Sequence, residues 1–87
     1  MFFYVYILKS LSDGEMYIGY TKNLAKRLEE HSDGISFSTK TRAPFKLIYY
    51  EAYLNMKDAQ KREMFFKTGW GRQYIQKALK HYFSAKI

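Results

Sequence analysis

Residues 3–20 read FYVYILKSLSDGEMYIGY and predict a β-hairpin at the start of the fold. Residues 3–9 are rich in aromatic and β-branched residues, which favour strands because their side chains pack well on a pleated surface. Ser12-Asp13-Gly14 is a turn signal, since Asp and Gly tolerate the backbone conformations that tight turns need. Residues 15–20 are then expected to form the second strand.

The alternation of side chains along this hairpin predicts that two tyrosines lie side by side. Tyr4 and Tyr6 share one face of the first strand. A two-residue loop would place Tyr17 and Gly19 on that face as well, whereas an odd loop length would not. A glycine beside the tyrosines would leave room for a ligand to approach the sheet. An ordinary aromatic cross-strand cluster fits the same pattern, so alternation alone leaves both interpretations open.

The rest of the chain predicts three helices and one further strand. The expected elements are a helix capped by Thr21 or Asn23 and ending near Ser32, a loop over residues 35–44, a strand over residues 45–53, a helix over residues 56–68 capped by Asn55 and stopped by Gly69, and a helix after Gly71. The order β-β-α-β-α-α predicts an α/β (α+β) fold, with a small three-stranded antiparallel sheet flanked by helices.

Length and composition limit the class of protein. A chain of 87 residues is expected to form one domain, over residues 1–87. The absence of cysteine excludes disulfides and zinc–thiolate sites and favours a cytoplasmic location. The apolar run over residues 1–8 is too short to span a bilayer and has no basic region before it. We therefore expect neither a membrane anchor nor a signal peptide.

The net charge of +7 indicates a polyanionic partner, because the positive charge gathers towards the end of the chain. From Lys61 onward, seven lysines and arginines stand against a single acid, Glu63. A solvated helical face would look the same, so charge alone does not decide between the two. If the partner is DNA, the candidate phosphate-binding residues are Lys40, Arg42, Lys61, Arg62, Lys67 and Arg72.

Two polar residues lie on one flank of the first predicted helix. Arg27 and His31 are four residues apart, beside the apolar positions Leu24 and Leu28. An arginine can hold a phosphate through two parallel hydrogen bonds, and a histidine can move a proton near neutral pH. A surface arginine next to a partly buried histidine is the alternative.

Glu63 interrupts an apolar stripe on the second predicted helix. Met56, Ala59, Glu63 and Phe66 recur at helical spacing. An ionised carboxylate on such a stripe needs a cationic side chain or a metal ion to offset its desolvation. A single carboxylate suits magnesium, which keeps several of its waters. A salt bridge to a neighbouring lysine or arginine would also satisfy it.

These residues, taken in order, closely resemble the motifs of the GIY-YIG nuclease domain. The matching positions are Tyr6, Tyr17-Ile18-Gly19, Asn23-Leu24-x-x-Arg27-Leu28, His31 and Glu63. The resemblance covers essentially the whole chain and indicates the small stand-alone bacterial form. It extends to the N-terminal nuclease domain of the excision-repair incision subunit. A single tripeptide would be a weak signal, but five positions at matching spacing are specific.

The resemblance implies a metal-dependent endonuclease that hydrolyses DNA phosphodiester bonds, in a structure-specific or repair-related role. It implies catalytic roles for Tyr6, Tyr17, Arg27, His31 and Glu63. Arg27 would steady the scissile phosphate, and Glu63 would hold one Mg²⁺ or Mn²⁺ ion. In the mechanism usually drawn for the family a tyrosine, Tyr17 here, takes a proton from the attacking water, with His31 as the competing base. Specificity is expected from DNA shape or from a protein partner.

The sequence also departs from the family pattern. The first motif reads Tyr4-Val5-Tyr6, without a leading glycine, and Tyr20 stands where some members carry a lysine. The asparagine that many members place on a later helix is missing, and Trp70 and Tyr74 occupy that region. The main alternative is therefore a DNA-binding module of the same fold with weak or no cleavage. A protein-interaction domain would explain the basic face less well.

Overall fold

A computed structural model describes residues 1–32 and 44–85 of the chain. Its elements are β1 (Phe3–Ser10), β2 (Met16–Thr21), α1 (Leu24–Ser32), β3 (Phe45–Tyr53), α2 (Met56–Phe66), α3 (Gly69–Ala78) and α4 (Lys80–Ser84). The strands form one antiparallel sheet in the order β2-β1-β3. The predicted three-stranded antiparallel sheet with flanking helices is therefore confirmed.

The register of the hairpin confirms that the two tyrosines share a face. Tyr6 pairs with Gly19, and Leu8 pairs with Tyr17, so the side chains of Tyr6, Leu8 and Tyr17 lie on one face of the sheet, the face on which Gly19 leaves space. The loop is longer than the two residues considered from sequence. The amide of Ser10 donates to the carbonyl of Glu15 at 2.9 Å, which leaves residues 11–14 to close the hairpin. This even number preserves the alternation.

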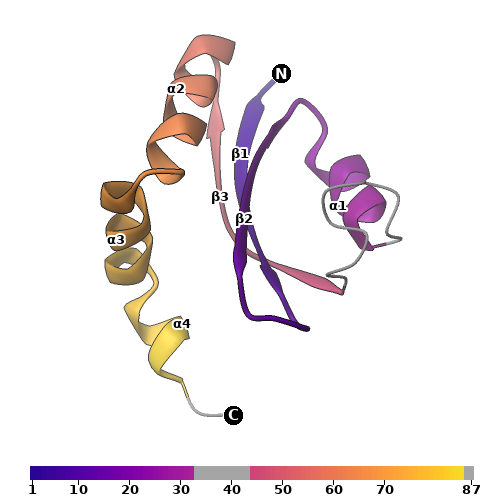
Figure 1. Ribbon diagram of the computed structural model, residues 1–87. Coiled ribbons are helices and arrows are strands. Elements are labelled where there is room, and N and C mark those ends of the chain that lie inside the picture. The colour runs from indigo at the N-terminus through magenta and orange to yellow at the C-terminus, as the bar shows by residue number, and fades with distance from the viewer. Residues whose placement is uncertain (33–43, 86–87) are drawn as a thin grey trace.

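Helices cover the two faces of the sheet unequally (Figure 1). On one side lies α1 alone, and on the other lie α2, α3 and α4. The main core is on the three-helix side, where Val5, Ile7, Ala59, Phe66 and Ile75 are buried together. Each large apolar side chain removed from water contributes about 1.5–3 kcal/mol to folding, so this side holds most of the stability.

An irregularity in β3 shapes the end of the sheet near α1. Ile7 pairs with Tyr49 and Leu8 with Leu47, which leaves Ile48 as an extra residue opposite them. Such a bulge bends the strand and increases its local twist. Beyond it, the ring of Phe45 at the start of β3 contacts His31 of α1, with ring centroids 5.9 Å apart.

The helical end of the chain differs from its prediction in two places. The helix expected over residues 56–68 ends at Phe66, and Thr68 caps the next helix by accepting a hydrogen bond from the amide of Gly71 at 3.1 Å. Gly69 therefore begins α3, where a stop alone was predicted. The single last helix expected after Gly71 is instead two helices, α3 and α4, divided at Leu79. Its amphipathic stripe did not reveal the break.

Candidate active site

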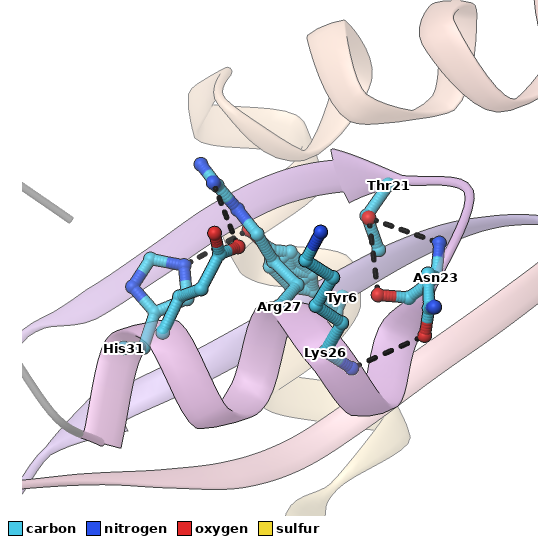
Figure 2. A network of polar contacts seen from close by, with 7 residues as sticks. Tyr6, Thr21, Asn23, Lys26, Arg27 and His31 are labelled. Atoms are coloured by element: carbon cyan, nitrogen blue, oxygen red, sulfur yellow. Dashed lines mark hydrogen bonds and ion pairs between the residues drawn. The ribbon is translucent and has the colours of Figure 1, made fainter. Parts of the chain in front are cut away.

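Three side chains from two elements meet at one oxygen atom. Nε of Arg27 donates a hydrogen bond to the hydroxyl of Tyr6 at 3.2 Å, and Nε2 of His31 lies 3.1 Å from the same oxygen. Tyr6 comes from the central strand, and the other two residues come from successive turns of α1 (Figure 2). Tyr6 is 2% exposed and His31 5% exposed, so the contact is held below the surface.

The start of α1 fixes the direction from which Arg27 and His31 reach the sheet. Of the two predicted caps, Asn23 caps the helix, because its side-chain oxygen accepts from the amide of Lys26 at 3.1 Å. Thr21 completes the turn before it, with its hydroxyl oxygen accepting from the amide of Asn23 at 3.1 Å (Figure 2). A helix anchored at this end of β2 places its second and third turns over Tyr6.

The surroundings of the three residues favour a neutral imidazole and a firmly charged guanidinium. Burial lowers the pKa of His31, and the positive charge of Arg27 lowers it further, while Glu30 opposes both. The hydrogen bond to Tyr6 raises the pKa of Arg27, helped by Glu30, against the effect of burial. Because Nε2 of a neutral imidazole is the acceptor in one of its two tautomers, Tyr6 donates its proton to His31 in that tautomer.

Gly19 has a different structural role from the one that the sequence predicted. A Cβ atom at this position would overlap the phenol ring and hydroxyl of Tyr6. The missing side chain therefore makes room for Tyr6 itself, which lies across the glycine, where sequence predicted an open approach for a ligand. This close contact is what allows Tyr6 to extend towards Arg27 and His31.

Tyr17 lies beside this group, against an aromatic residue that the sequence did not single out. Its ring contacts Phe45 edge to face, with centroids 5.2 Å apart, and Phe45 in turn contacts His31. Edge-to-face aromatic pairs of this kind hold ring orientation and add about 0.5–1.5 kcal/mol beyond burial. The two predicted tyrosines are thus both present at the site, each held by different neighbours.

A pocket of about 180 Å³ brings all five predicted catalytic residues together. Its lining consists of Tyr6, Leu8, Tyr17, Ile18, Gly19, Tyr20, Arg27, His31 and Glu63. Glu63 comes from α2, on the opposite side of the sheet from α1. Both sides contribute because β2 is an edge strand, and the pocket reaches around that edge. The sequence indicated the individual residues, but the meeting of α1 and α2 at one edge depends on the tertiary fold.

Tyr20 is a pocket residue that the sequence analysis noted only as a departure from the family pattern. By alternation it belongs to the opposite face of β2 from Tyr17 and Gly19, so it was not expected beside them. Its hydroxyl oxygen is buried and has no hydrogen-bond partner among the described residues. It lines the same pocket as Glu63. A buried hydroxyl facing a polar pocket is suited to a ligand or a bound water.

The polar groups of the pocket are of the kind that can hold a hydrated divalent ion through one carboxylate. In the described part of the chain, no three acidic, histidine or cysteine side chains cluster as a metal site. Glu63 contributes one half-buried carboxylate, and the Tyr20 hydroxyl supplies a further polar atom. Magnesium commonly keeps several waters and takes only one or two carboxylates, so this donor set suits it. Glu63 also accepts an ion pair from Lys67 at 3.3 Å, the alternative that sequence left open.

One of the predicted phosphate-binding arginines has an internal partner. Arg62 donates to both carboxylate oxygens of Glu51, at 2.9 and 3.2 Å, and its guanidinium lies 4.6 Å from the ring centroid of Phe66. Tyr49 and Tyr53 also donate to Glu51. Burial alone would raise the pKa of Glu51, but Arg62 and the two tyrosines hold it below its usual value. Burial and Glu51 together raise the pKa of Tyr53 to about 12.

The other candidate phosphate-binding residues are placed differently. Lys61 and Arg72 are exposed, on α2 and α3 respectively. Lys67 is also exposed, but it is paired with Glu63, which lines the pocket. Lys40 and Arg42 lie outside the described residues. DNA binding by these six residues stays a prediction, and for Arg62 it would require giving up part of its contact with Glu51.

Comparison with known proteins places the chain in a family. Residues 2–80 match the GIY-YIG catalytic domain, so the chain belongs to the GIY-YIG family, which is a family of nucleases. Its relatives include small bacterial proteins named UPF0213. One from Clostridium perfringens is 42% identical over 74 residues, which are 84% of this chain and 78% of that protein. One from Staphylococcus aureus is 44% identical over 66 residues, covering 75% and 79% of the two chains.

A solved structure supports the same assignment. The solution NMR structure of a UPF0213 protein from Bacillus halodurans is similar to this chain, with a TM-score of 0.57 and 32% sequence identity. The match covers 92% of this chain and 86% of that one. The predicted membership of the GIY-YIG family in its small bacterial form is therefore confirmed.

Proposed function

We propose that the protein is a metal-dependent endonuclease that hydrolyses DNA phosphodiester bonds in the pocket at the edge of β2. The observation that carries the proposal is the convergence of Tyr6, Tyr17, Arg27, His31 and Glu63 on one pocket. These residues come from two strands, β1 and β2, and two helices, α1 and α2. They supply a cation for phosphate, groups that can exchange protons, and a carboxylate.

Arg27 is suited to hold the scissile phosphate. Its Nε is bound to Tyr6, and one terminal nitrogen lies 3.5 Å from Glu30, which leaves further N–H groups on the guanidinium. Its side chain is 39% exposed, so a phosphate can reach it. Charge-assisted bonds from arginine to phosphate oxygens would orient the phosphorus for attack and stabilise the charge that develops there.

A proton path runs from the pocket through Tyr6 to His31. An attacking water would give its proton to the Tyr6 oxygen as Tyr6 passes its own proton to Nε2 of His31, which lies 3.1 Å away. The lowered pKa of His31 keeps its imidazole neutral at pH 7, the form that can accept. The contacts of the Tyr6 oxygen with Arg27 and His31 favour Tyr6 over Tyr17 as the first proton acceptor. His31 then receives the proton.

Glu63 and Tyr20 would hold a divalent ion and its water shell. When bound there, Mg²⁺ or Mn²⁺ would neutralise charge on the leaving oxygen. We further propose that the substrate is structure-specific or repair-related DNA and that a protein partner adds specificity. The proposed location is the cytoplasm. In residues 1–32 and 44–85, no helix is long and apolar enough to cross a membrane.

A cleavage assay tests the proposal. Purified protein would be incubated with linear, flapped, forked and four-way DNA in Mg²⁺, in Mn²⁺ and in excess chelator. We expect cutting of at least one substrate, abolished by the chelator. If no substrate is cut while DNA is still bound, the second candidate function holds, a DNA-binding module of the same fold. The pairing of Glu63 with Lys67, which neutralises the carboxylate internally, favours that alternative.

A further inference from the structure

On the side of the sheet covered by a single helix, two aromatic rings are exposed, and Tyr4, which contacts both of them, is partly buried. Phe2, Tyr4 and Tyr50 form a row, with ring centroids 6.4 Å apart from Phe2 to Tyr4 and 6.1 Å apart from Tyr4 to Tyr50. Tyr50 is 52% exposed and Phe2 46% exposed. Tyr50 pairs with Tyr6 across β1 and β3, so the row lies on the same face as the candidate active site. We name these three residues the aromatic shelf.

A hollow of about 420 Å³ separates the aromatic shelf from the first turn of α1. Tyr4 and Tyr50 line it on the sheet side, and Lys22, Leu24 and Leu28 line it on the helix side. Its volume falls within the roughly 300–1,000 Å³ of small-ligand sites, and its walls are largely apolar with one cation. It can therefore receive a flat apolar group that is attached to a negative charge.

A basic groove connects this hollow with the candidate active site. The groove shares Lys22 with the hollow beside the aromatic shelf, and it shares Tyr20 and Arg27 with the catalytic pocket. Lys22, Lys26 and Arg27 give it three cations, against one acid, Glu30, which is already bonded to Arg27. The groove thus borders the candidate active-site pocket through Tyr20 and Arg27, and it borders the hollow beside the aromatic shelf through Lys22, just before α1.

We propose that this path binds an unpaired DNA strand, with its phosphates along the cationic groove and one base stacked on the aromatic shelf. Stacking on an aromatic side chain needs an exposed base face, which bases inside a duplex do not offer. The substrate would therefore carry unpaired nucleotides next to the scissile phosphate, as a flap, a fork or a single-stranded end does. The three cations favour a nucleic acid over an apolar peptide or a second copy of the chain.

The position of the scissile phosphate in this path rests on the proposed nuclease function, but strand binding does not. It is therefore tested without cleavage, in excess chelator, by fluorescence anisotropy with end-labelled DNA. A forked DNA and a continuous duplex with equal numbers of phosphates would be compared. The variants are Tyr50→Ala, Tyr50→Phe, which keeps the ring, and Trp70→Ala. Trp70 is a control because it is 76% exposed and lies on α3, on the other side of the sheet.

The wild-type protein should bind the fork more tightly than the duplex. Tyr50→Ala should weaken binding of the fork by about 5- to 150-fold, the loss typical of one stacked base, and leave binding of the duplex nearly unchanged. Tyr50→Phe and Trp70→Ala should bind the fork as the wild type does. A 2-aminopurine base in the unpaired arm should be quenched by the wild type and less by Tyr50→Ala.

Equal wild-type affinity for fork and duplex would overturn the inference. The inference would also be overturned if Tyr50→Ala lost the same amount of affinity for the fork and for the duplex. It would be overturned as well if Trp70→Ala lost as much affinity for the fork as Tyr50→Ala does. The outcome is separable from that of the proposed function. Tyr50-dependent binding of the fork without metal-dependent cutting would keep the strand path and reject the nuclease. Cutting that is indifferent to unpaired nucleotides and to Tyr50 would keep the nuclease and reject the strand path.

Discussion

A single phenol oxygen links the sheet to α1. The hydroxyl of Tyr6 contacts Arg27 and His31, and Gly19 provides the space that the ring occupies. No other hydroxyl in the described part of the pocket has both contacts. In the proposed reaction, Tyr6 is therefore better placed than Tyr17 to pass a proton to His31.

The two tyrosines can be separated by removing one oxygen at a time. Tyr6→Phe should lower the cleavage rate by roughly 10²–10⁴-fold, because the first proton acceptor is lost while the packing of the ring is kept. Tyr17→Phe should cost less, because its ring contact with Phe45 is retained. Single-turnover cleavage rates measure both. A dead Tyr17→Phe beside an active Tyr6→Phe would reverse the assignment and restore the role that the family resemblance implied for Tyr17.

Burial of His31 predicts a loss of stability in mild acid. Its folded-state pKa lies below 6.5, so the unfolded chain binds the proton more readily than the native protein. The contribution is present above about pH 6.5 and is lost as the pH falls through the lower, folded-state pKa of His31. Urea denaturation at pH 7.5 and at pH 5.5 measures the free energy of unfolding under both conditions. The free energy of unfolding should decrease less between these two pH values in His31→Gln than in the wild type. In the control variant, His81→Gln, it should decrease as much as in the wild type. An equal fall in His31→Gln would reject this origin.

At the level of elements, α3 approaches the end of α2 very closely at Gly71. A Cβ atom at Gly71 would overlap the backbone of Phe65 and Phe66, whereas one at Gly69 would meet nothing within 4 Å. The two glycines are two residues apart on the same helix. They therefore form a matched pair for testing how closely α3 must approach α2.

Gly71→Ala should destabilise the fold by about 1–3 kcal/mol, because the added methyl group must push α3 away from α2. Gly69→Ala should leave stability nearly unchanged or raise it slightly, since alanine reduces the freedom of the unfolded chain. Thermal denaturation distinguishes them, at roughly 4–8 °C for each kcal/mol. Equal melting temperatures for the two variants would show that α3 can move away from α2 at Gly71 without loss of stability.

The sequence predicted the helices and strands better than it predicted the tertiary contacts between them. The aromatic and β-branched run of β1 and the parity of the hairpin predicted the face shared by Tyr6 and Tyr17. Alternation put Tyr20 on the other face, and its place in the pocket follows only from the position of β2 at the edge of the sheet. Periodicity could not show that Arg62 binds Glu51, because that pairing joins α2 to β3 across the core.

At the scale of the whole molecule, the unequal covering of the sheet explains the location of the site. Three helices cover one face of the sheet, over the main core, while α1 alone lies on the other face (Figure 1). On that second face Phe2 and Tyr50 of the aromatic shelf are exposed. The candidate active-site pocket lies at the edge strand β2, where residues from both sides of the sheet can meet. A small fold thus combines a stable face with a face available for a substrate.

We propose that Glu63 supports metal-dependent cleavage, whereas in the alternative function it only pairs with Lys67. Glu63→Gln and Lys67→Gln both remove that ion pair, so each should lose a similar, small amount of stability, about 0.3–0.5 kcal/mol for an exposed helical pair. The decisive measurement is the rate of Mg²⁺- or Mn²⁺-dependent DNA cleavage by both variants and the wild type, with DNA affinity measured alongside. We predict that Glu63→Gln binds DNA but does not cut it, and that Lys67→Gln still cuts. Equal cleavage by Glu63→Gln and the wild type would exclude Glu63 as the residue that holds the catalytic ion.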